Sequence, residues 1–125
     1  MGADQVAAIC PALVKVEKGA KTGDFCATFE VPESGGRHWV QVVSRTVNFA
    51  YPDQTDPLRR LTDLGIAALP GQRLVSWKAG KFATIEHSPI PAAELARFVD
   101  LLFSKHMGAG ADYQIEVAVQ DLEKD

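Results

Sequence analysis

The sequence predicts an α+β fold in which a mostly antiparallel sheet is covered on one face by two main helices. Residues 91–107 carry apolar side chains at steps of three and four, which is typical of an amphipathic helix. Residues 24–31 alternate between apolar and polar side chains, which is typical of a half-buried strand. Two further β-rich segments flank Ala79-Gly80, as in a hairpin. Helices beside an antiparallel sheet are the economical packing of these parts, and residues 1–125 are predicted to form a single domain.

The predicted order of elements is α-β-β-β-α-β-β-α-β. The first is a short helix over residues 5–9, which Pro11 is expected to stop. Three strands follow at Ala12–Glu17, Asp24–Val31 and Arg37–Tyr51. The third strand loses the alternation of its apolar residues, which indicates a central strand, partly buried on both faces, with a bulge.

The second helix is predicted to begin at Asp56-Pro57, with the aspartate as N-cap and the proline in the first turn. Its inward residues are Leu58, Leu61 and Leu64. A hairpin over residues 72–87 comes next, and the last strand is expected at Tyr113–Val119.

The helix over residues 91–107 is expected to lie across the sheet. Its inward residues are Leu95, Phe98, Val99, Leu102 and Phe103. Its outward residues are Glu94, Arg97, Asp100 and Ser104. Lys105 and His106 are explained by the negative end of the helix dipole.

Composition excludes several classes of function. The chain is 46% hydrophobic with a formal net charge of −3, so a nucleic-acid partner is not expected. No apolar run approaches the roughly 20 residues that span a bilayer, and the N-terminal segment lacks the basic start of a signal peptide. The expected location is therefore the cytoplasm. Cys10 and Cys26 are expected to be reduced thiols, since their spacing is not C-x-x-C.

A search for catalytic motifs finds none. The three histidines do not occur in an H-E-x-x-H spacing: His38, His87 and His106. The serines examined as nucleophiles lack a G-x-S-x-G elbow: Ser76, Ser88 and Ser104. We therefore predict no catalytic residue, no cofactor-binding residue, no metal ligand and no cofactor, and a protein that is not an enzyme is favoured over an enzyme. Trp39 and Trp77 are interpreted as core residues or, alternatively, as anchors for a partner.

The order of parts from Trp39 to Met107 resembles a known fold. A long strand leads into a short leucine-rich helix, a hairpin with the sequence RLVSWKAGKFATIEH, a proline-bearing link and an amphipathic helix. This order is similar to the type III secretion chaperone-like fold, which includes the YbjN-like bacterial proteins. The resemblance implies a small, acidic, typically dimeric and non-enzymatic bacterial protein that holds or binds other proteins. It supplies no catalytic residue. This chain departs from the pattern in its short first helix and in the strand after the last helix.

Three functions remain open. The first is a protein-binding or chaperone-like module that acts as a homodimer and contacts a partner through a sheet face or through an exposed edge strand such as Tyr113–Val119. The alternative is a small-ligand-binding protein or enzyme with a pocket between sheet and helices, where Arg45, His38 and His87 are candidate polar groups. The third is a subunit that functions only within a larger complex.

Overall fold

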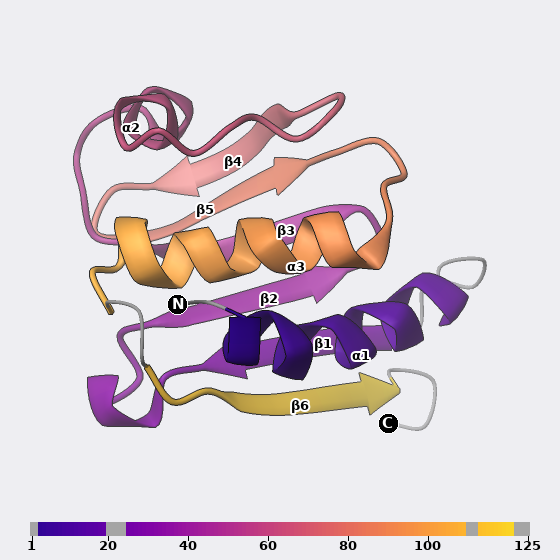
Figure 1. Ribbon diagram of the computed structural model, residues 1–125. Coiled ribbons are helices and arrows are strands. Elements are labelled where there is room, and N and C mark those ends of the chain that lie inside the picture. The colour runs from indigo at the N-terminus through magenta and orange to yellow at the C-terminus, as the bar shows by residue number, and fades with distance from the viewer. Residues whose placement is uncertain (1–2, 20–24, 110–112, 122–125) are drawn as a thin grey trace.

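A computed structural model describes residues 3–19, 25–109 and 113–121 (Figure 1). Its centre is a six-stranded sheet in the order β4-β5-β3-β2-β1-β6, and every neighbouring pair of strands is antiparallel. The strands are β1 Phe25–Glu30, β2 Trp39–Val43, β3 Thr46–Tyr51, β4 Arg73–Lys78, β5 Lys81–Glu86 and β6 Glu116–Asp121. The helices are α1 Ala3–Gly19, α2 Pro57–Asp63 and α3 Ala92–Leu101, which continues as a π-helical turn over Leu102–His106, and a 3-10 turn spans Pro32–Ser34. The α+β class and the predicted order of elements are confirmed.

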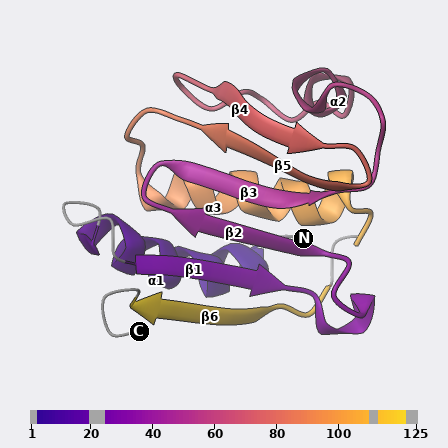
Figure 2. The ribbon, with the colours of Figure 1, turned by 180° about the vertical axis from the view of Figure 1, so that it is seen from behind.

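Helices α1 and α3 lie side by side on one face of the sheet (Figure 1). The view from behind shows the strands of the other face uncovered (Figure 2). Helix α2 lies beside β4 at the edge of the sheet. The second covering helix is therefore α1, whose length the sequence analysis underestimated. None of the helices in the described residues is long and apolar enough to cross a bilayer.

Helix α1 continues through Pro11, where a stop and then a strand were predicted. A proline inside a helix removes a hydrogen bond and costs about 3 kcal/mol. Burial of one large aliphatic side chain contributes about 1.5–3 kcal/mol. Four apolar residues at helical spacing are buried along α1 and offset the cost of the proline: Ile9, Ala12, Leu13 and Val16. The strand predicted at Ala12–Glu17 is wrong because this helical series continues across the proline.

The run predicted as one long strand is a hairpin of β2 and β3, joined by a two-residue turn at Ser44 and Arg45. Ser44 has a φ of 53°, in the left-handed region that two-residue turns favour and that residues other than glycine rarely adopt. The turn shifts the alternation of buried positions, since Val42 before it and Val47 after it are both fully buried. This turn, and not a bulge, explains the lost alternation in the sequence.

The remaining elements follow their local signals closely. Oδ1 of Asp56 accepts hydrogen bonds from the backbone N–H groups of Leu58 (2.9 Å) and Arg59 (3.3 Å), which confirms the predicted N-cap of α2. The predicted hairpin forms β4 and β5, whereas β6 begins at Glu116 rather than at Tyr113. The five apolar residues expected to face inward from the last helix are all buried: Leu95, Phe98, Val99, Leu102 and Phe103.

The uncovered face of the sheet carries a row of polar side chains. Thr84 Oγ1 donates a hydrogen bond to Asn48 Oδ1 (2.9 Å), and Gln41 Nε2 donates one to Thr28 Oγ1 (3.4 Å). The four residues lie in register on the neighbouring strands β5, β3, β2 and β1. This polar row crosses the middle of the uncovered face and interrupts any apolar surface there.

Candidate functional site

A pocket opens where α1, the β2–β3 turn and the segment before α3 meet. Its volume is about 280 Å³. Most of its wall is apolar, formed by Leu13, Val16, Val42, Pro89, Ile90, Ala92 and Leu95. The lining residues with polar side chains are Ser44, Arg45 and His87. The pocket thus lies between the sheet and the helices, where the small-ligand alternative places it, and it brings together two of the three candidate polar groups.

His87 follows β5 and is only 7% exposed. Its backbone N–H donates to Arg45 O (3.0 Å), and its Nδ1 lies 2.7 Å from Ser88 O. Because a carbonyl oxygen only accepts hydrogen bonds, we assign the proton to Nδ1, which leaves Nε2 as the free nitrogen. Nε2 is buried and has no hydrogen-bond partner among the described residues. A buried polar atom without a partner costs about 1–3 kcal/mol, so a ligand that bonds to Nε2 recovers this cost.

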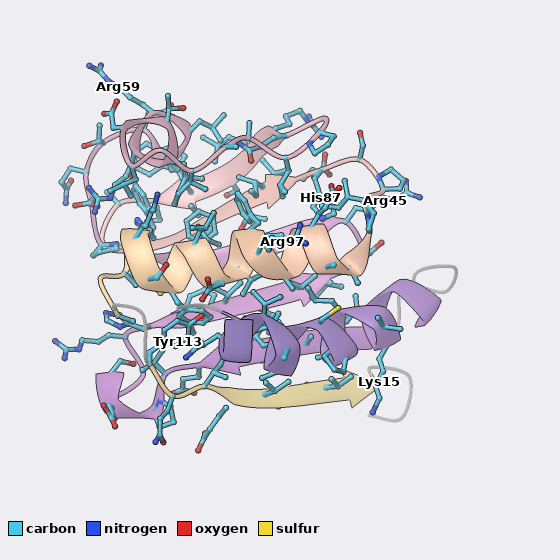
Figure 3. The ribbon with its side chains drawn as sticks, viewed as in Figure 1. Lys15, Arg45, Arg59, His87, Arg97 and Tyr113 are labelled. Atoms are coloured by element: carbon cyan, nitrogen blue, oxygen red, sulfur yellow. The ribbon has the colours of Figure 1, made fainter. Side chains whose placement is uncertain are left out.

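Arg45 lines the same pocket from the β2–β3 turn, and Figure 3 shows it next to His87. Within the described part of the chain, its guanidinium makes no hydrogen bond and no ion pair. Helix α3 begins at the same place, and its N-cap residue, Pro91, makes no side-chain capping bond. The positive end of the α3 dipole therefore adds to the charge of Arg45, and the polar side of the pocket favours an anion.

The third candidate, His38, lies in a different place. It lines a second hollow of about 490 Å³, which is also bordered by Trp39, Lys81 and His106. The structure therefore separates His38 from Arg45 and His87, so these three residues do not form one site.

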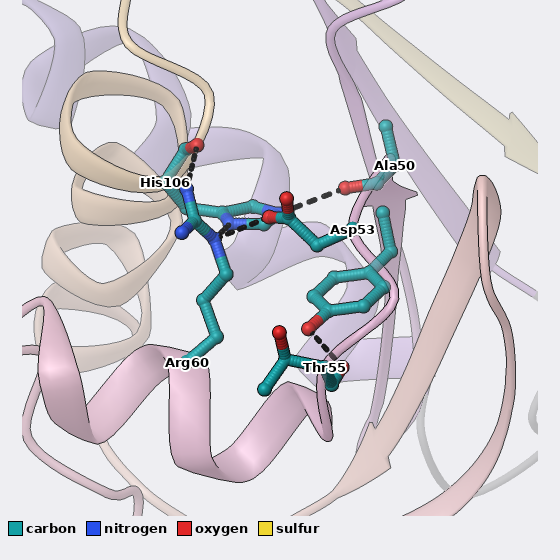
Figure 4. A network of polar contacts seen from close by, with 6 residues as sticks. Ala50, Asp53, Thr55, Arg60 and His106 are labelled. Carbon is teal, nitrogen blue, oxygen red and sulfur yellow. Dashed lines mark hydrogen bonds and ion pairs between the residues drawn. The ribbon is translucent and has the colours of Figure 1, made fainter.

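A polar network beside this second hollow was missed by the sequence analysis (Figure 4). His106 is 4% exposed, its Nε2 lies 3.1 Å from Ala50 O, and its Nδ1 accepts from Arg60 Nε (3.2 Å). Arg60 Nε also lies 2.6 Å from Asp53 Oδ2. Burial lowers the pKa of His106, and the nearby Arg60 charge lowers it further. The dipole explanation of His106 was incomplete, because its ring is buried and stacks on Tyr51 with centroids 5.4 Å apart.

Asp100 forms a second buried contact that was not predicted. It was expected to point outward, yet it is only 9% exposed, and its Oδ1 accepts from Tyr113 Oη (2.6 Å). Gln5 Nε2 donates to Tyr113 O (2.8 Å). Burial and the carboxylate raise the pKa of Tyr113. These contacts connect α1, α3 and the segment before β6, which is a structural role.

The two cysteines are free thiols. Cys26 is buried on β1, and burial raises the pKa of its thiol. Because the thiolate is the reactive form, Cys26 is poorly suited to nucleophilic or redox chemistry. Across the residues that the structure describes, no group of three or more histidine, cysteine, aspartate or glutamate side chains is placed to hold a metal ion.

The two tryptophans differ in exposure. Trp39 is half-buried on β2, whereas Trp77 is 36% exposed on the edge strand β4. The Trp77 ring packs edge-on against Tyr51, with centroids 5.8 Å apart. Val75 lies at a register shift in β4 and is 47% exposed, and Val117 on the opposite edge strand β6 is 40% exposed. Exposed large apolar side chains of the described residues therefore lie on the two edge strands.

No protein-family model matches the chain, and no curated protein or solved structure matches it either.

Proposed function

We propose that the chain is a non-enzymatic, chaperone-like module that binds protein and acts as a homodimer. The observation that carries this proposal is the edge strand β4, where Val75 and Trp77 are both exposed. Exposed tryptophan is enriched at interface hot spots, and an edge strand offers unpaired backbone groups to another strand. The resemblance to the type III secretion chaperone-like fold supports a bacterial, cytoplasmic protein of this kind.

The Trp77 ring is already held in place before any partner binds. Its edge-on contact with Tyr51 restricts its rotamers, and Tyr51 itself is fully buried. Binding through a pre-ordered side chain loses less conformational entropy than binding through a free one. This contact supports β4 as a rigid docking edge.

A second copy of the chain is the partner that we favour. Closed two-fold symmetry is the commonest arrangement of soluble oligomers. Antiparallel pairing of β4 with β4 of a second copy would bring both copies of Val75 to the middle of the interface. The uncovered sheet face is less suited to this role because of its polar row, and β6 offers one exposed large apolar side chain where β4 offers two.

Sedimentation equilibrium of the wild-type chain and two variants tests the proposal. We expect a wild-type dimer at high micromolar concentration and a monomer for Val75→Lys, because an edge lysine opposes strand pairing. Val117→Lys is the matched control on β6 and should remain dimeric. A wild-type monomer at high micromolar concentration, or equal effects of the two lysines, would contradict the proposal.

A further inference from the structure

We propose that the pocket between α1, α3 and the β2–β3 turn binds a small carboxylic acid with an apolar tail. The carboxylate lies at Arg45 and His87, and the tail lies along the apolar wall. This site is separate from the β4 edge and does not depend on the proposed dimer.

Three residues that line the pocket supply the groups for the carboxylate. Arg45 supplies a guanidinium with no ion-pair partner among the described residues, and this group suits a carboxylate with two parallel hydrogen bonds. His87 supplies Nε2, which is buried and unpartnered, and the carboxylic acid and Nε2 share one proton, which the ligand brings into the site. Ala92 lines the pocket at the start of α3, where backbone N–H groups have no side-chain cap. The one acidic residue in this first turn, Glu94, is exposed.

The rest of the pocket selects the tail. Five aliphatic side chains from α1, β2, the link before α3 and α3 itself form its wall: Leu13, Val16, Val42, Ile90 and Leu95. An apolar cavity of about 150 Å³ accommodates benzene, so about 280 Å³ has room for roughly ten non-hydrogen atoms. An eight-carbon acid is of this size.

The same features argue against other ligand classes. A cation would face the unpaired charge of Arg45 and the positive end of α3. A strongly hydrated dianion would lose solvation against the aliphatic wall without compensation. A neutral apolar molecule would leave the buried His87 Nε2 without a partner and would gain nothing from the charge of Arg45. A monoanion with an apolar tail satisfies both parts of the pocket.

Titrations with octanoate, 1-octanol and acetate test this proposal. Calorimetry measures the affinities, and NMR of the backbone amides locates the binding site. We expect octanoate to bind at least tenfold more tightly than either control, since 1-octanol lacks the charge and acetate lacks the tail. The amide resonances of His87, Ile90 and Ala92 should shift with octanoate. Equal binding of octanoate and 1-octanol, or no shift of these amides at millimolar octanoate, would overturn the proposal.

Two variants assign the contacts, and two others are controls. Arg45→Gln should weaken octanoate binding at least tenfold, and His87→Asn should also weaken it while retaining a donor for the Ser88 carbonyl. Arg97→Gln is the matched control, because it removes the same charge from an exposed position on α3 outside the pocket lining. If Arg97→Gln and Arg45→Gln weaken binding equally, the specific site is refuted. Val75→Lys should leave octanoate binding unchanged, which separates this test from that of the dimer.

Discussion

Acidification should destabilise the protein through His106. The ring is buried and neutral, and its Nδ1 accepts a hydrogen bond from Arg60 Nε. A proton added to Nδ1 would face the guanidinium. Burial, with Arg60 as a further cause, therefore lowers the folded-state pKa of His106 below the usual 6.5. Below pH 6.5 the unfolded chain binds this proton more readily than the folded chain does. The free energy of unfolding therefore decreases as the pH decreases, by up to about 1.4 kcal/mol per pH unit.

Urea unfolding from pH 7.5 to pH 5 measures this effect when wild type is compared with His106→Gln. Glutamine retains a side-chain N–H for Ala50 O and does not titrate. We expect the two stability curves to run parallel above pH 7 and the wild-type curve to fall more steeply below pH 6.5. His38 and His87 are present in both proteins, so their contributions cancel. Identical slopes, or a wild type that gains stability relative to the variant as pH falls, would refute this reasoning.

Three further predictions test the fold. Gly71→Ala forces a side chain at φ +67° and places Cβ against the Ser88 hydroxyl and 3.2 Å from the Ser88 backbone nitrogen, whereas Gly80→Ala at φ +78° meets open space, so the Tm should fall further for Gly71→Ala. Ser44→Gly should raise the free energy of unfolding by about 1 kcal/mol because it relieves the left-handed serine, and an unchanged urea midpoint would contradict this. Tyr113→Phe removes the donor to the buried Asp100 carboxylate and should cost about 1–3 kcal/mol in urea unfolding, unlike a surface substitution.

Elements with strong local signals were predicted well from the sequence. The N-cap at Asp56 acts within two or three residues, and the apolar spacing that begins at Leu95 repeats over several turns. Such signals depend on neighbouring residues only, so they survive folding unchanged.

Two predictions in the N-terminal half of the chain were wrong for a different reason. Pro11 was expected to end a helix on local grounds, yet burial of the residues on both sides overrides its cost. The turn at Ser44 was not predicted from the sequence because serine is not a typical residue for a left-handed conformation. One predicted strand became helix and another became two strands, so the predicted order of elements is correct although these residue assignments are not.

The polar contacts of the candidate sites could not be predicted from the sequence. Arg60 and His106 are far apart in the chain and meet only because α2 and the end of α3 approach the same end of β3. The pairing of Arg45 with His87 likewise requires β3 and β5 to be neighbours in the sheet. Sequence periodicity does not supply this strand order, so Arg45 and His87 remained candidates without a common site.

Hydrogen–deuterium exchange as a function of protein concentration tests the central claim most directly. We predict that the amides of β4, Arg73–Lys78, become more protected over the concentration range in which the mass doubles from 13.5 kDa, while those of β6 do not change. A dimer that forms without added protection in β4, or with protection confined to β6, would contradict the proposed interface.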